Sequence, residues 1–264
     1  GDPMVRSAEI CRALEVPPPA RPADIVRFML GRSLDADPGA RHAYSNFGYC
    51  VLGRIIEKVS GGSYEAYVRE HVLAPLGIRG MRLGRTLERD RAPREVRYHD
   101  VRGREGVAVM GERIGLEVPR PYGAWCLESM DAHGGWLASA EDLVRFAAAF
   151  DEPAACPILG EDAVRRMVAR PDGAAGHEAD GTPARTYYGC GWMVRPVAGG
   201  GSDRWHHGGL DGTSTLLVCR HDGVCWAVLC NGRVSPEGVD LARAIDGPMH
   251  RAADAVTSWP VREP

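Results

Sequence analysis

Residues 213–230 read TSTLLVCRHDGVCWAVLC. Two runs in this stretch, Thr213 to Arg220 and Val224 to Cys230, are rich in the β-branched, aromatic and other apolar residues that are typical of strands. The residues between them, His221-Asp222-Gly223, contain Asp-Gly, a strong signal for a tight turn between antiparallel strands. The stretch therefore predicts a β-hairpin and places a sheet in the C-terminal part of the chain.

Before residue 180 the apolar residues follow a helical period. The stretch Ala23 to Leu30 is amphipathic. Beyond Gly48 the spacing i, i+3, i+4 indicates a buried helix face, made by Val51, Leu52, Ile55, Ile56 and Val59. Gly61-Gly62 is expected to end that helix, and Ser63 and Ser139 are expected to cap two further helices.

The order of these elements predicts the fold class. A mostly helical region, residues 1–180, precedes a region of antiparallel strands, residues 181–264. The second region closes with a helix that Gly247-Pro248 is expected to break. Helices followed by an antiparallel meander describe an α+β fold. Residues 84–125 lack periodicity and are expected to form a long surface excursion that borders a site.

The composition excludes some partners. The chain has 264 residues, of which 25% are charged, and its net charge of −3 gives no electrostatic reason to bind nucleic acid. No apolar run approaches the ~20 residues of a membrane-spanning helix. Eight cysteines without a Cys-x-x-Cys pair predict free thiols that pack as small apolar side chains.

The triplet Tyr44-Ser45-Asn46 stands directly before the helical pattern that runs on from Gly48. A phenol has an ordinary pKa of ~10, so Tyr44 serves as a base at neutral pH only where nearby positive charge favours the phenolate. The amide of Asn46 offers donors and an acceptor for orienting a substrate. The alternative is structural: Asn46 caps the helix and Tyr44 packs nearby.

A second candidate motif, Trp205-His206-His207-Gly208-Gly209, precedes an alternating β pattern. His206 is the catalytic candidate, because a histidine titrates near neutral pH and can carry protons. His207, Gly208 and Gly209 are candidates for substrate binding, since glycines let a substrate approach a main-chain N–H that faces a developing oxyanion. The alternative is a glycine-rich turn with two surface histidines.

Neither motif predicts a metal or a cofactor. Adjacent histidines on a strand point to opposite faces, so they rarely bind one ion. The chain also lacks His-Glu-x-x-His, the helical spacing of a zinc site.

Taken together, the motifs resemble those of the β-lactamase-related serine hydrolases, which include penicillin-binding proteins. The similar segments occur in the family's order over about residues 35 to 235: Pro38-Gly39, Tyr44 to Gly53, His71 to Gly77, His133 to Ser139, Tyr188 to Trp192 and His206 to Thr213. The resemblance implies a β-lactamase/transpeptidase-like α+β fold. It makes the two regions parts of one domain, without that fold's first strands and nucleophile helix.

The resemblance also implies roles for matching residues. Tyr44 corresponds to the family's catalytic tyrosine, which passes a proton to the leaving group, and Asn46 to the asparagine beside the acyl group. His206 stands where the family has the lysine of Lys-Thr-Gly. Gly209 corresponds to the residue whose N–H helps to form the oxyanion hole. A histidine at position 206 favours small ester, amide or peptide substrates over β-lactams.

The third family motif, Ser-x-x-Lys, carries the nucleophile and is absent. The only lysine is Lys58, and the residue three positions before it is Ile55. We therefore expect this chain to be the C-terminal part of a longer serine acyl hydrolase, inactive alone, with its nucleophile upstream or on another chain. The alternative is a non-catalytic binding or structural module derived from the same fold.

The first of these interpretations makes two geometric predictions. The side chains of Tyr44 and His206 should lie within roughly 10 Å of each other, close enough for one acyl group to touch both, because catalytic contacts are ~3 Å long. The missing helix should leave the cleft open, or leave apolar surface exposed beside it.

Overall fold

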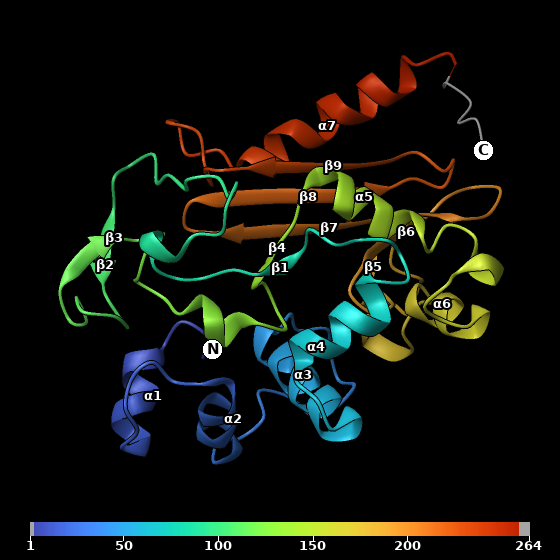
Figure 1. Ribbon diagram of the computed structural model, residues 1–264. Helices are drawn as coiled ribbons and strands as arrows, with labels where there is room; N and C mark the ends of the chain where they lie inside the picture. Colours follow the sequence, from blue (N-terminus) through green and yellow to red (C-terminus); the bar gives the residue numbers. More distant parts are fainter. Residues whose placement is uncertain (1–2, 259–264) are drawn as a thin grey trace.

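The computed structural model describes residues 3–258 and confirms the α+β prediction. Its centre is a five-stranded antiparallel sheet in the order β5-β6-β7-β8-β9 (Figure 1). The strands are β5 Tyr187–Tyr188, β6 Met193–Pro196, β7 Ser202–Leu210, β8 Thr213–Cys219 and β9 Cys225–Cys230. The α-helices are α1 Ser7–Leu14, α2 Pro22–Leu30, α3 Asn46–Ser60, α4 Tyr64–Val68, α5 Ala140–Ala148, α6 Glu161–Met167 and α7 Leu241–Asp254.

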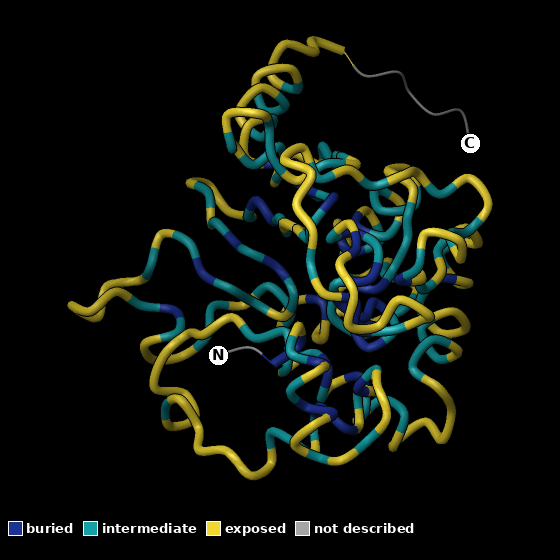
Figure 2. Tube along the Cα trace, turned by 90° about the vertical axis from the view of Figure 1, so that its left-hand side faces the viewer, coloured by how far each residue is buried: buried dark blue, intermediate teal, exposed yellow. Residues whose placement is uncertain are grey.

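The predicted hairpin is confirmed, and both faces of its sheet are covered. β8 and β9 pair from Ser214↔Cys230 to Cys219↔Cys225. Leu216 and Val218 point to one face, where they pack in a cluster with residues of α7. Cys219 points to the other face and packs with residues of α5 and α6. Figure 2 shows buried residues in the middle of the molecule and also in its lower part, and a separate buried cluster includes residues of α1, α2 and α3.

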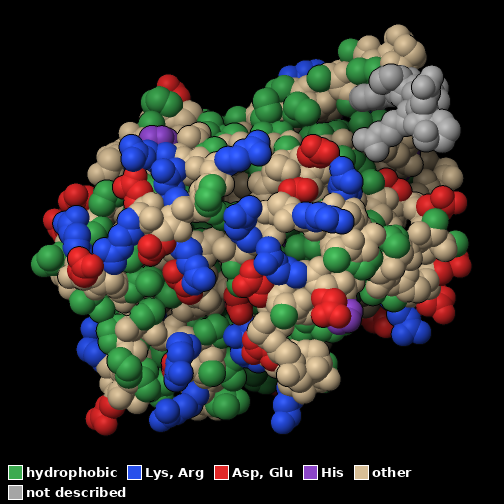
Figure 3. Space-filling view, viewed as in Figure 1, with side chains coloured by type: hydrophobic (Ala, Val, Ile, Leu, Met, Phe, Trp, Pro, Cys, Tyr) green, Lys and Arg blue, Asp and Glu red, His purple; other side chains and the backbone are tan. Residues whose placement is uncertain are grey.

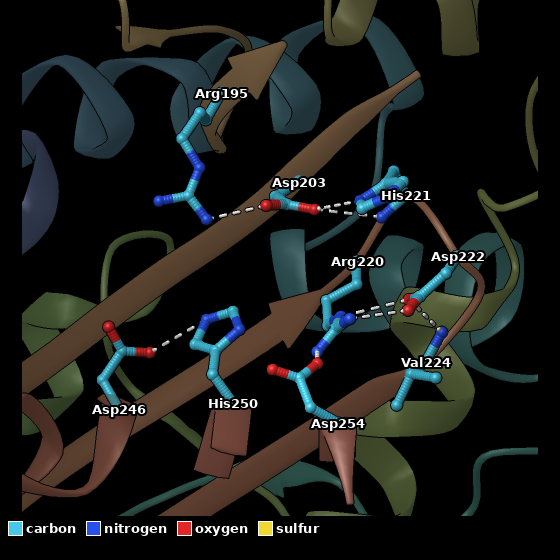
Figure 4. Close-up of polar contacts among 9 residues, drawn as sticks. All are labelled: Arg195, Asp203, Arg220, His221, Asp222, Val224, Asp246, His250 and Asp254. Carbon is cyan, nitrogen blue, oxygen red and sulfur yellow. Dashed lines mark hydrogen bonds and ion pairs between the residues drawn. The ribbon is translucent and has the colours of Figure 1, made fainter. Parts of the chain in front are cut away.

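The motif around His206 lies within a strand rather than before one. β7 runs from Ser202 to Leu210 and includes both histidines and both glycines. The start of β7 is fixed by Asp203, which accepts hydrogen bonds from Arg195 at 2.7 Å and from His221 Nδ1 at 2.8 Å (Figure 4). These contacts tie β6 and the β8–β9 turn to β7, so the strand that carries His206 is held from both sides.

Helix α3 begins and ends as its sequence indicates, with one difference at its start. Ser45, not Asn46, caps the helix by accepting a hydrogen bond from the Gly48 N–H. Gly61 ends it in the left-handed conformation, at φ 72°. Inside the helix, a Cβ on Gly53 would lie 2.6 Å from that of Ala132, so the close approach of these two segments requires glycine.

The predicted burial of the apolar face of α3 is wrong for three of its residues. The side chains of Leu52, Ile55 and Val59 are 51%, 49% and 78% exposed. The helix instead buries Cys50 and Gly53. The periodicity correctly indicated a helix with an apolar face, but no described segment covers most of that face.

The other sequence predictions have mixed outcomes. Ser63 and Ser139 cap α4 and α5 as expected. The chain continues from α4 into a π-helical turn, Arg69–Leu73. Helix α7 is not broken at Gly247-Pro248, because Ile245 and Met249 on either side both pack against the sheet and hold the helix together across Pro248.

The region 84–125 forms an excursion at one end of the sheet (Figure 1). It contains a short hairpin of β2 Glu105–Val107 and β3 Glu117–Pro119, while β1 Arg82–Leu83 pairs with β4 Trp136–Leu137. Basic and acidic side chains are interspersed over the face shown in Figure 3, with no large area of one sign. No helix among the described residues is both long enough and apolar enough to span a bilayer.

Candidate active site

Tyr44 and His206 lie close together, as the sequence predicted. Their ring centroids are 6.5 Å apart, although one residue precedes α3 and the other lies in β7. Tyr44 is 55% exposed, whereas His206 is half-buried. The site is therefore open on the tyrosine side and walled by the sheet on the histidine side.

Asn46 belongs to the same cluster. The hydroxyl of Tyr44 donates a hydrogen bond to Asn46 Oδ1 at 3.2 Å. Because Ser45 caps the helix, the interpretation of Asn46 as an ordinary N-cap is wrong, and its amide is directed to Tyr44 instead. The first residue of α3 thus places a polar amide beside the phenol.

Two further tyrosines complete the cluster, and the site predictions from sequence missed both. The hydroxyl of Tyr188 lies 2.9 Å from His206 Nε2 and 3.3 Å from the hydroxyl of Tyr49. The Tyr188 ring also makes an edge contact with Tyr44, at 6.2 Å, and lies 5.5 Å from the ring of His42. The only sequence signal for Tyr188 was its place in one of the family-like segments.

Burial determines the charge state of these groups. It lowers the pKa of His206 below its ordinary value, so the imidazole is neutral at pH 7. Burial also raises the pKa of Tyr188, and the hydrogen bond with Tyr49 raises it further, so Tyr188 keeps its proton. His206 therefore does not supply the positive charge that Tyr44 would need in order to act as a base.

His207 is directed away from this cluster. Successive side chains of a strand point to opposite faces, and His207 pairs with Leu216, which packs with the α7 cluster. His207 is exposed on that face. The structure thus brings Tyr44, Asn46 and His206 together and leaves His207 outside the cluster, so a substrate-binding role for it stays a prediction.

Gly208 has a structural reason to be glycine. It lies opposite Thr215 in the register of β7 and β8. A Cβ at position 208 would overlap the Thr215 Oγ1 atom. Packing against the neighbouring strand is therefore one reason for a glycine here, and the interpretation of Gly208 as space for a substrate stays a prediction.

Gly209 has its backbone at a free strand edge. β6 pairs with β7 only as far as Trp205, so the rest of β7 has no partner on that side among the described residues. The Arg220 N–H donates to the Val224 carbonyl beyond β8. The backbone N–H and C=O groups of even-numbered residues in β8 therefore point to β9, and those of odd-numbered residues point to β7. The odd-numbered residues of β8 pair with the even-numbered residues of β7. The backbone groups of the odd-numbered residues of β7, including Gly209, therefore point to the free edge.

The cluster has little capacity to hold a metal. Among its members only His206 is a common metal ligand. Elsewhere in the described part of the chain, Asp151, Cys219 and Cys225 place ligand atoms within 4.8 Å of one another. Arg204 donates to Asp151 at 2.6 Å, and its positive charge competes with any cation for that carboxylate.

Comparison with known protein families shows which family the chain belongs to. The family model described as Beta-lactamase matches residues 8–247. The chain belongs to the beta-lactamase family. Penicillin-binding protein 4 of Amycolatopsis lactamdurans is 28% identical over 226 residues, which cover 81% of this chain and 54% of that protein.

Solved structures share the beta-lactamase-type fold. A D-stereospecific amidohydrolase from Streptomyces sp. superposes with a TM-score of 0.60 at 21% identity, over 80% of this chain and 56% of the other. D-amino acid amidase from Ochrobactrum anthropi SV3 gives 0.62 at 21% identity, over 89% and 63%. The chain thus spans little more than half the length of these relatives.

Proposed function

We propose that this chain supplies the proton-transfer and oxyanion-binding side of a serine acyl hydrolase that acts on small esters, amides or peptides. The observation that carries the proposal is the contact of Tyr44 with Asn46 and with the ring of His206 in one open cluster. Membership of the beta-lactamase family supports a serine hydrolase, and the named relatives include amide-cleaving proteins. The choice of small esters, amides or peptides as the substrates is also part of the proposal.

The proposed chemistry is acyl transfer through an acyl-enzyme. A serine oxygen forms a bond to the substrate carbonyl carbon while the bond to the leaving group breaks. The serine proton passes through the Tyr44 hydroxyl to the departing oxygen or nitrogen, so no net charge is left behind. Asn46 orients the acyl group, and the Gly209 N–H at the free edge stabilises the oxyanion. Neutral His206, hydrogen-bonded to Tyr188, positions the tyrosine and the substrate.

We propose that residues outside this chain contribute the nucleophile. The sequence has no Ser-x-x-Lys, and His206 is kept neutral by burial, so the positive charge that activates Tyr44 has to come from elsewhere. The lysine of Ser-x-x-Lys would supply it. The exposed apolar face of α3, at Leu52, Ile55 and Val59, is a surface that a further helix would cover.

The second candidate is a non-catalytic module that keeps the cluster without the nucleophile. One observation favours it: the single lysine, Lys58, lies in α3 without a serine three positions before it. This candidate predicts binding of a small substrate without turnover under any condition.

The test is a tyrosine variant in a completed enzyme. The DNA preceding the codon for Gly1 is read, and any in-frame segment with Ser-x-x-Lys is expressed with this chain. Tyr44→Phe should then lower kcat by roughly 10²–10⁴-fold with little change in KM, because it removes a proton carrier and almost no volume. A stop codon followed by a genuine start at this chain, or a Tyr44→Phe enzyme of normal kcat, would sink the proposal.

A further inference from the structure

Two cysteines stand opposite each other at the turn end of the β8–β9 hairpin. Cys219 and Cys225 are partners in the register of these strands, and their sulfur atoms lie within 4.8 Å of each other. Both side chains pack in the cluster that contains residues of α5 and α6. Cys219 is fully buried there, whereas Cys225 is half-buried. The sequence predicted separate apolar packing for these thiols, and the hairpin brings the two together.

The geometry of the hairpin suits a bond between these sulfur atoms. The Arg220 N–H donates to the Val224 carbonyl at 2.9 Å, so these two residues form a hydrogen-bonded pair. The next pair, Cys219 and Cys225, is then a non-hydrogen-bonded pair, in which the side chains approach most closely and the Cα atoms are ~4.5 Å apart. A disulfide joins Cα atoms that are ~4.4–6.8 Å apart. The two sulfurs can therefore bond without a rearrangement of either strand.

The carboxylate beside the pair does not turn it into a metal site. Asp151, just after α5, has an oxygen within 4.8 Å of both sulfurs, and the Cys225 thiol donates to it at 3.8 Å. Arg204 donates to the other oxygen of Asp151 at 2.6 Å and to the Phe150 carbonyl at 3.1 Å. This buried guanidinium already balances the charge of Asp151. The two sulfurs, rather than three metal ligands, are therefore the reactive unit.

A small reagent can reach the half-buried sulfur. A cavity of about 230 Å³ has Asp151 and Arg204 among its lining residues. Asp151, which contacts the Cys225 thiol, is exposed to solvent. The hydrogen bond with Cys219 and burial raise the pKa of Cys225, so its attack on a reagent is slow at neutral pH. Cys225 is therefore the sulfur that reacts first, and the buried Cys219 completes the bond.

We propose that Cys219 and Cys225 are a modification site, which a low-molecular-weight disulfide oxidises to one cross-strand disulfide. The Cys225 sulfur attacks one sulfur of the reagent, whose S–S bond breaks, and one reagent thiol leaves. Cys219 then attacks the Cys225 sulfur of this mixed disulfide, and the second reagent thiol leaves. Two protons pass from the cysteines to the two departing thiols. The cysteines lose two electrons and the reagent gains them, so a dithiol reductant reverses the reaction.

The new bond closes the end of the hairpin. It joins β8 and β9 across a loop of seven residues, 219–225. A cross-link of this length restricts the unfolded chain more than the folded one, so it should raise the midpoint of thermal unfolding by about 5 °C. Neither cysteine belongs to the cluster of Tyr44, Asn46 and His206, so the site is separate from the proposed acyl transfer.

The test is disulfide mapping of the full, folded chain. The reduced chain is incubated with oxidised glutathione at pH 8, its remaining thiols are alkylated, and it is digested with trypsin. Cleavage after Arg220 separates the two cysteines, so the proposed bond yields a product in which peptide 205–220 is linked to peptide 221–233. We expect this product to account for most of the disulfide, and dithiothreitol to return the chain to its reduced form.

Variants identify the bond within the linked peptides. Cys225→Ser and Cys219→Ala should each abolish the linked product and the rise in the thermal midpoint. Cys230→Ser is the matched control and should form the product as the wild-type chain does. Cys230 lies in the same strand and the same tryptic peptide as Cys225, but it pairs with Ser214, whose hydroxyl accepts from the N–H of Ala242 in α7 on the other face.

The mapping of the wild-type chain decides the matter even where a variant does not fold. Two results there would overturn the proposal: Cys219 and Cys225 that both remain alkylated after a day in excess oxidised glutathione, or disulfides spread over the other cysteines. A linked product that persists in Cys225→Ser would also overturn it. An oxidised chain with an unchanged thermal midpoint would contradict the closing of the hairpin.

Discussion

At the residue scale, burial lowers the pKa of His206, a member of the candidate site, and so keeps its ring neutral at pH 7. The sequence resemblance matches His206 to a lysine of the family, and in the structure its ring lies 2.9 Å from the Tyr188 hydroxyl. The sequence predicted Tyr44, Asn46 and His206 as site residues because each lies in a distinctive motif, and the structure places the three close together. It could not predict the contact between Tyr188 and His206, because that contact arises only when the sheet places β5 and β7 on either side of β6.

The lowered pKa of His206 predicts an acid sensitivity of the fold. Between this pKa and the ordinary value of ~6.5 the unfolded chain binds the proton more tightly than the folded one, so stability falls as pH drops through that window. The loss is at most ~1.4 kcal/mol per pH unit for one proton. Urea unfolding at pH 7.5 and pH 5 should show a smaller stability difference for His206→Gln than for the wild-type chain.

The carboxyl group of Asp203 provides an internal comparison with His206 at lower pH. Burial by itself would raise the pKa of Asp203, but hydrogen bonds from Arg195 and His221 outweigh it and lower the pKa to about 2. Its contribution is therefore complete above ~4 and is lost only as pH falls towards 2. An unchanged pH dependence between 7.5 and 5 in His206→Gln would contradict the assignment of that window to His206.

At the element scale, local sequence signals correctly predict where helices and turns begin and end, but they do not predict which faces are buried by other segments. The hairpin, the serine caps and the glycine end of α3 depend on a few neighbouring residues, so the sequence predicts them. The exposed face of α3 and the unbroken α7 depend on which other segments pack against them. Gly208 illustrates the difference, because its neighbour Thr215 lies on another strand.

Gly208→Ala separates a packing role from a substrate role. The added Cβ would overlap Thr215 Oγ1, so the variant should lose about 1–3 kcal/mol of unfolding free energy, measured by urea denaturation. Thr215→Ala in the same chain removes that oxygen and should restore most of the loss. If Gly208→Ala instead keeps full stability and weakens only ligand binding, the original interpretation of space for the substrate is the correct one.

At the scale of the whole molecule, the chain combines membership of the beta-lactamase family with a cluster of candidate site residues. The resemblance of short motifs predicted the α+β fold and the family, because the motifs keep their order along the chain. A cavity lined by Arg102, Arg104, Arg120 and Arg233 could not be predicted in this way, because these arginines come from two segments that lie far apart in the sequence. The cluster of Tyr44, Asn46, Tyr188 and His206 is assembled without a Ser-x-x-Lys nucleophile in the chain.

The most direct test of this account is covalent labelling of the isolated chain. A fluorophosphonate or penicillin probe, followed by mass spectrometry, reports any serine that is activated for attack. We predict no stable adduct at any serine of this chain, because none has the lysine partner and His206 is directed to Tyr188. Stoichiometric labelling of a serine within residues 1–264 would contradict the account.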